Sequence, residues 1–214
     1  MISHMQSMLK YKELINSIPA YNQSAKIKLK FWTRFSYQDK SRIEKAIFGN
    51  IDEVEISRAD IFSEADTKTK IIMVLMWGYP TGGRGNNIES ILTQIDKLSQ
   101  FLSSVEKQNL TKKQANNLIK QLMNIRGLGI STWSKFLYFF NIAIDSKRCQ
   151  IYDLKIVDSL NKKQFSELDT HIWKQDVEHY YQYIELVDNL AKQMDAAPEQ
   201  VELFLFYYNL YYKF

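Results

Sequence analysis

The sequence contains a single cysteine, Cys149, and only three histidines, so it lacks the residues for several kinds of site. One cysteine excludes an internal disulfide, and it cannot supply the four thiolates of an iron–sulfur cluster. The three histidines show no metal-ligand spacing. We therefore expect that no cofactor is required.

Long apolar runs are absent as well. The longest one, residues 71–77, is far shorter than the roughly 20 residues that a membrane span needs. The first residues lack the basic and then apolar order of a signal peptide. With 45% hydrophobic and 24% charged residues, the composition is that of a soluble globular protein. We expect a cytoplasmic monomer that has no membrane partner.

Strand-like alternation is nearly absent, and helical periodicity dominates instead. Apolar residues recur at helical spacing over residues 88–102, 115–123 and 133–140. Asn86 or Asn87 is a natural N-cap for the first stripe, and Thr111 is one for the second. Pro198 suits the first position of the last helix. This pattern predicts an all-α fold.

We expect the chain to form one unit, residues 1–214, with two helical lobes and a cleft between them. The first lobe would span residues 86–158. Residues 1–85 together with 159–214 would form the second lobe. The net charge of +4 permits an anionic partner without requiring one.

Two of the seven glycines, Gly127 and Gly129, lie between the second and third stripes, in NIRGLGISTWSKFLYFF. So short a connection predicts a helix-hairpin-helix, in which glycine tolerates positive φ and lets a DNA phosphate reach backbone amides. Carbonyls in this segment could also hold a potassium or sodium ion. The alternative is a plain turn between two helices, in which glycine only caps a helix. The candidate carbonyls for the ion are those of Met123, Ile125 and Leu128.

Three segments, in this order, resemble the helix-hairpin-helix DNA glycosylases. Residues 85–91, GNNIESI, are similar to the helix start of the eight-oxoguanine branch, and residues 125–132, IRGLGIST, resemble the hairpin signature. Residues 151–156, IYDLKI, resemble the segment that carries the catalytic aspartate. The resemblance is closest to small prokaryotic members of that branch without an iron–sulfur cluster. It implies base excision from double-stranded DNA that contains a damaged or modified base.

The resemblance assigns catalysis to Asp153, which would stabilise positive charge on the sugar and activate water. The alternative is that Asp153 only caps the helix that follows it. It also assigns DNA contacts to the hairpin and to the loop before the first stripe, where a side chain would fill the gap left by the flipped base. That loop could equally be a turn with an asparagine cap. The implied DNA contacts are Gly127, Gly129, Ile130, Thr132, Lys155, Arg84, Asn86 and Asn87.

One departure changes the expected chemistry. Ser131 stands where bifunctional relatives carry a nucleophilic lysine, and serine cannot form a Schiff base. We therefore expect a monofunctional glycosylase. Lys135 lies one helical turn further on, on the same face. Three roles for Lys135 are open: a displaced nucleophile in a glycosylase/lyase, a contact to a DNA phosphate, or a solvated surface lysine.

The last helix resembles the segment that stacks on and reads the flipped base. It implies that Phe206 stacks on the base and that Glu202 accepts hydrogen bonds from the base edge. Tyr138 is placed in the same base pocket. The aromatic residues of this helix could also simply pack in the core. The expected substrate is an oxidised guanine or a modified, phage-type base. Its removal would serve genome repair or phage defence. The alternative from another functional class is a non-enzymatic helix-hairpin-helix DNA-binding protein.

Overall fold

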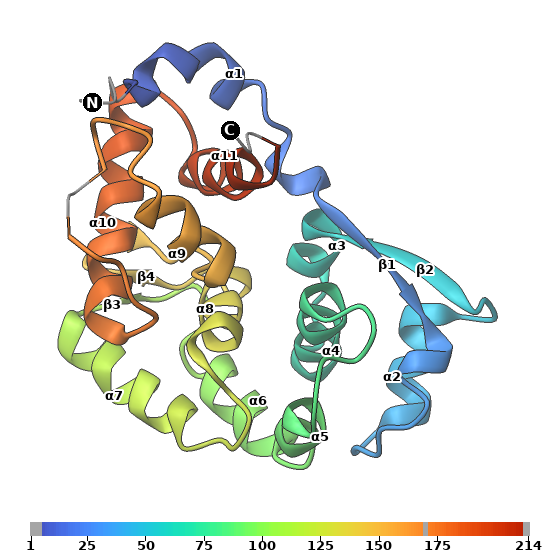
Figure 1. Cartoon of the computed structure of the whole chain (residues 1–214). Helices are drawn as coiled ribbons and strands as arrows, with labels where there is room; N and C mark the ends of the chain where they lie inside the picture. The colour runs from blue at the N-terminus through green and yellow to red at the C-terminus, as the bar shows by residue number, and fades with distance from the viewer. Residues whose placement is uncertain (1–5, 169–170, 212–214) are drawn as a thin grey trace.

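The computed structural model, which describes residues 6–168 and 171–211, is built mostly of helices (Figure 1). The helices are α1 (Lys12–Asn16), α2 (Lys40–Phe48), α3 (Arg58–Ser63), α4 (Thr67–Gly78), α5 (Asn87–Leu92), α6 (Ile95–Ser103), α7 (Lys112–Met123), α8 (Ile130–Phe139), α9 (Leu154–Asn161), α10 (Val177–Met194) and α11 (Pro198–Tyr211). Short 3-10 helices span Met8–Tyr11, Ala20–Asn22 and Leu29–Phe31. The predicted fold class is confirmed. Within the described ranges, no helix combines the length and the apolarity that crossing a membrane requires.

Two small sheets accompany the helices, and the sequence analysis missed both. Strands β1 (Ser24–Lys28) and β2 (Glu53–Ser57) form an antiparallel pair. The second sheet has the order β3 (Asn109–Leu110), β4 (Ala143–Ile144) and β5 (Lys147–Arg148). Apolar and charged residues do alternate in β1 (SAKIK) and β2 (EVEIS), but each of these strands has only five residues. The strands of the second sheet have two residues each, which is too short for any pattern.

The structure confirms several of the predicted helix starts. The Thr111 side chain accepts from the backbone of Gln114 and forms a capping box at the start of α7. Pro198 opens α11. Asn86 occupies the N-cap position of α5 but makes no side-chain capping bond. The predicted stripe over residues 88–102 is interrupted after Leu92, so it forms two helices, α5 and α6, rather than one.

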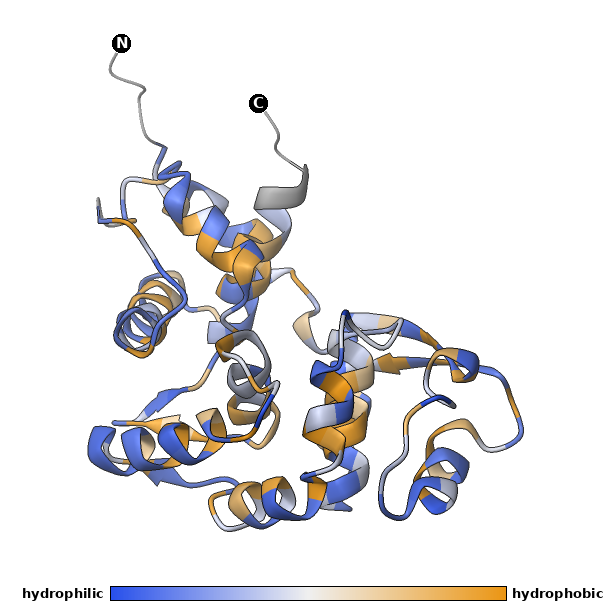
Figure 2. Ribbon diagram, turned by 60° about the horizontal axis from the view of Figure 1, so that its bottom comes forward, coloured by the Kyte–Doolittle hydropathy of each residue, from blue (hydrophilic) through white to orange (hydrophobic). Residues whose placement is uncertain are grey.

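Helix α4 lies at the centre of the core. Residues 69–76 of α4 are all buried, and the helix packs against α6, α8 and β1. Orange hydrophobic residues run along these central helices in Figure 2. On the other side of α8, α11 packs against α9 and α10. The end of α4 and the starts of α8 and α9 thereby come together. The division into two lobes stays a prediction.

Candidate active site

A pocket of about 570 Å³ lies where the end of α4 meets α8, α9 and α11. It brings together five residues that the sequence analysis singled out: Ser131, Lys135, Asp153, Lys155 and Phe206. Ser131 and Lys135 belong to α8, Lys155 to α9 and Phe206 to α11, and Asp153 is the N-cap residue of α9. The remaining lining residues are Gln23, Ser24, Ala25, Trp77, Gly78, Tyr79, Pro80, Leu154 and Tyr207.

Asp153 is the N-cap of α9, as one of its two interpretations proposed. Its Oδ1 accepts hydrogen bonds from the backbone N–H groups of Lys155, at 3.0 Å, and Ile156, at 3.2 Å. Its Oδ2 is not used in the cap and lies 3.9 Å from Nζ of Lys135. The side chain is 19% exposed, so the carboxylate borders the pocket. Capping therefore leaves one carboxylate oxygen available for chemistry.

Lys135 is buried, with only 5% of its surface exposed, so the interpretation as a solvated surface lysine is wrong. The end of α4 packs against the face of α8 that carries this lysine, since a Cβ atom on Gly78 would lie 3.1 Å from Cδ of Lys135. Nζ of Lys135 donates to the Ser131 carbonyl at 2.7 Å and to the Ser131 hydroxyl at 3.2 Å. Burial lowers the pKa of Lys135, while the nearby carboxylates of Asp153 and Glu202 act in the opposite direction. The neutral amine is the form that attacks carbon.

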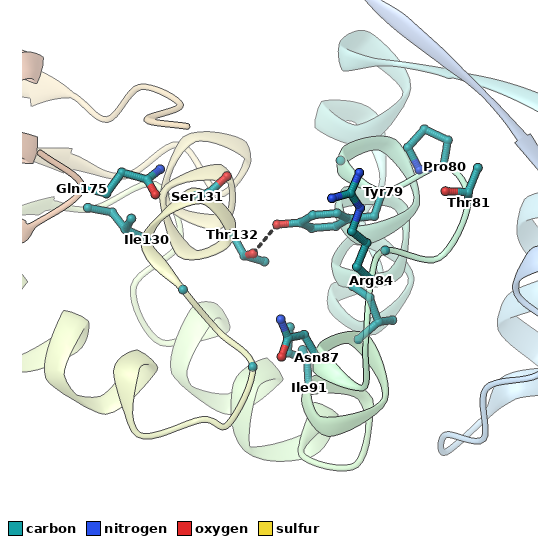
Figure 3. Close-up of a pocket in the computed structure, with 15 residues that line it drawn as sticks. Tyr79, Pro80, Thr81, Arg84, Asn87, Ile91, Ile130, Ser131, Thr132 and Gln175 are labelled. Carbon is teal, nitrogen blue, oxygen red and sulfur yellow. Dashed lines mark hydrogen bonds between the residues drawn. The ribbon is translucent and has the colours of Figure 1, made fainter. Parts of the chain in front are cut away.

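The turn between α7 and α8 borders a second pocket, of about 520 Å³ (Figure 3). Tyr79, Arg84 and Asn87 line it on one side, and Ile130 and Thr132 of α8 line the other. The hydroxyls of Tyr79 and Thr132 are hydrogen-bonded across it at 2.6 Å. Most of the expected DNA contacts therefore meet at one place. Asn86 and Lys155 do not line this pocket, and Lys155 lies with Nζ 4.6 Å from the ring centre of Phe206.

The two glycines of the turn have different conformations and surroundings. The sequence analysis expected both to adopt positive φ and to admit a phosphate, and the structure corrects one part of this expectation for each. Gly127 has φ +88°, and a Cβ atom there would lie 2.5 Å from the carbonyl oxygen of Asn87. Its missing side chain thus lets protein backbone pack close. Gly129 has φ −80°, caps α8 and would place a Cβ in open space, so the expected positive φ is wrong for this residue. In the same turn, the Ile125 carbonyl already accepts from the Leu128 N–H at 3.1 Å.

Of the three residues expected in the base pocket, only Phe206 lines it. Glu202 and Tyr138 lie behind its wall, and both contact the buried Arg58. Nη2 of Arg58 is 2.8 Å from Oε2 of Glu202, and Nη1 donates to the Tyr138 hydroxyl at 3.0 Å. Burial raises the pKa of Glu202, against the opposing effect of Arg58. Glu202 is 1% exposed because it extends into the core, where a guanidinium compensates its charge.

Comparison with known proteins identifies the family of the chain. Residues 19–206 match the sequence model of the family described as "Putative 8-oxoguanine DNA glycosylase OGG-like protein". The chain belongs to this OGG-like family. No curated protein and no solved structure matches the chain. The match includes Lys135, Asp153 and every residue that lines the two pockets except Tyr207. Membership implies that DNA is the substrate class.

Sequence reasoning missed three residues that help to form the pocket of this OGG-like protein: Gln23, Gly78 and Tyr79. Gln23 precedes β1, a strand of only five residues whose alternation of apolar and charged residues the sequence analysis overlooked. Gly78 follows the long apolar run, where a glycine indicates a helix end or a turn, so the sequence did not indicate its contact with Lys135. Nothing in the sequence indicated the hydrogen bond of Tyr79 to α8.

Proposed function

We propose that this OGG-like protein is a DNA glycosylase/lyase that excises an oxidised or otherwise modified base, with Lys135 as its nucleophile. The observation that carries the proposal is the placement of the Lys135 amine 3.9 Å from Asp153 Oδ2 inside a pocket with aromatic walls. The amine lies 3.2 Å from the hydroxyl of Ser131, the residue that replaces the lysine of bifunctional relatives. The Lys135 amine therefore lies close to the place of the lysine in bifunctional relatives, although its residue is one helical turn further along α8.

The proposed reaction uses the two side chains in sequence. Nζ of Lys135 attacks C1′ of the flipped nucleotide, and the electron pair of the N-glycosidic bond leaves with the base, which takes up a proton. Asp153 stabilises the positive charge on the sugar and accepts a proton from the attacking amine. The sugar ring then opens to a Schiff base as O4′ takes up a proton. Loss of a proton from C2′ expels the 3′ phosphate.

The monofunctional route remains the alternative within the same pocket. In that case Asp153 would activate a water that attacks C1′, and Lys135 would only orient groups or neutralise charge. The burial of Lys135, which lowers its pKa, favours the amine route, because it keeps more of the lysine in its nucleophilic form. The two routes differ in whether a covalent enzyme–DNA adduct forms.

For DNA binding, we propose that the α7–α8 turn receives a backbone phosphate at the N-terminus of α8. The open space at Gly129 supports this placement, since a phosphate oxygen could approach the amides there. Arg84 and Asn87 would contact the strand opposite or fill the gap left by the flipped base. Carbonyls of Met123, Ile125 and Leu128 would hold a monovalent cation. The protein would act as a monomer, either in genome repair or against modified phage DNA.

The test is excision from duplex oligonucleotides that each carry one modified base, followed by alkali. We expect cleavage at the modified position by the native protein, with 8-oxoguanine as the first base to try, and a loss of at least ~100-fold in Asp153→Asn. Absence of alkali-labile product with every base would leave only the non-enzymatic DNA-binding alternative. Binding to the same duplexes should weaken as salt rises, because phosphate contacts release counterions.

A further inference from the structure

Gln23 lies at the pocket that holds Lys135 and Asp153, directly before β1. Its backbone carbonyl accepts from the Arg58 N–H at 3.0 Å and from Nε1 of Trp77 at 3.3 Å. Two elements, α3 and α4, thus fix the main chain of Gln23 at the pocket wall. The Gln23 main chain is therefore held at a defined place in the pocket wall.

The orientation of the Gln23 carboxamide follows from Arg58. Nε of Arg58 donates to Oε1 of Gln23 at 2.7 Å. A guanidinium has donors only, so it selects the oxygen of the amide and turns the NH₂ group away from itself. Arg58 cannot readily move, because it is 1% exposed and bound to Glu202 and Tyr138. Among the described residues, none accepts a hydrogen bond from the Gln23 NH₂ group.

We propose that the Gln23 NH₂ group donates a hydrogen bond to a ring carbonyl oxygen of the flipped base, and that Gln23 thereby determines base specificity. This inference rests on the proposed glycosylase function of the same pocket. Oxidised guanine offers carbonyl oxygens at C6 and C8, whereas adenine offers none. A polar group built to bind a carbonyl disfavours bases that lack it, because the NH₂ group would lose water without gaining a partner.

The proposal also gives a role to the two residues that lie behind the pocket. Glu202 and Tyr138 hold Arg58, and Arg58 holds Gln23, so a chain of hydrogen bonds runs from the core to the pocket. Glu202 would then act on the base through Arg58 and Gln23 and not by direct contact. It is a positioning residue, and Gln23 is the residue that touches the base.

The experiment compares Gln23→Leu and Gln23→Glu with the native protein in single-turnover excision of 8-oxoguanine. Leucine removes the amide, and glutamate keeps an oxygen for Arg58 while it removes the donor. We expect both variants to excise 8-oxoguanine about 10-fold more slowly or worse. As a matched control, the same proteins are trapped with borohydride on a duplex that already contains an abasic site. That reaction needs Lys135 but no base, so its rate should stay unchanged.

A second substrate, 8-oxoadenine, identifies which carbonyl is read, since it keeps the C8 oxygen but has an amino group at C6. If Gln23 reads the C6 oxygen, Gln23→Glu excises 8-oxoadenine faster than the native protein does. If it reads the C8 oxygen, Gln23→Glu excises both 8-oxoguanine and 8-oxoadenine more slowly than the native protein does. Native rates in both variants, or an equal fall in abasic-site trapping, would overturn the proposal. Failure of the native protein to excise any base would instead contradict the proposed function itself.

Discussion

Gly78 at the end of α4 lies directly against the side chain of Lys135. A Cβ atom on Gly78 would lie 3.1 Å from Cδ and 3.3 Å from Cε of the lysine. The absence of a side chain at residue 78 therefore makes the space in which the lysine stem lies. The end of one helix thus sets the position of an amine on another.

Replacing Gly78 with alanine should displace that amine. The φ angle of Gly78 is outside the positive range, and alanine favours helix over glycine by about 1 kcal/mol, so the fold should tolerate the change. We expect single-turnover excision to fall about 10-fold or more, because a small misplacement of a reacting group is costly. Thermal unfolding measured in parallel should show no loss of stability. An unchanged excision rate would mean that the close contact with Gly78 does not position Lys135.

The two glycines of the α7–α8 turn should respond differently to alanine. In Gly127→Ala, the positive φ costs about 1–2 kcal/mol, and the approach to the Asn87 carbonyl adds overpacking of about 1–3 kcal/mol. We therefore expect a clear loss of stability in urea denaturation. Gly129→Ala should keep the stability of the native protein but bind duplex DNA more weakly. If Gly129→Ala bound DNA as tightly as the native protein, the phosphate would not lie at that residue.

Replacing Lys135 with methionine should stabilise the protein at neutral pH. Burial lowers the pKa of Lys135 in the folded state, so the unfolded chain binds more protons between that pKa and the ordinary value of about 10.4. Stability should therefore rise with pH in this window, and the lysine weakens the fold most below it. We expect Lys135→Met to gain about 1 kcal/mol at pH 7, with the gain shrinking toward pH 10. Urea denaturation at both pH values measures this, and a variant less stable than the native protein would contradict it.

The sequence predicted the features that depend on local patterns. Thr111 as the cap of α7 and Pro198 as the start of α11 follow from neighbouring residues alone, and both are confirmed. Asp153 before α9 was expected both as a cap and as a catalyst. The structure confirms the cap, whereas the catalytic role stays a prediction.

The features that the sequence could not supply depend on contacts between distant segments. Periodicity placed Lys135 on the same face of α8 as Ser131 but left its exposure open, and α4, which lies far away in the sequence, buries it. Glu202 could not be assigned to the core without its partner Arg58, which precedes it by more than half the chain. The role of Gly127 likewise depends on its contact with the backbone of Asn87.

The central claim is that Lys135 forms a covalent bond to the sugar of the excised nucleotide. Its most direct test is borohydride trapping on a labelled duplex that contains the excised base, with Lys135→Gln compared with Lys155→Gln. Lys155 is the matched control because it is the other lysine that lines the pocket. The account predicts a trapped adduct in the native protein and in Lys155→Gln, and none in Lys135→Gln. An adduct that persists in Lys135→Gln, or base excision by the native protein with no adduct at all, would contradict it.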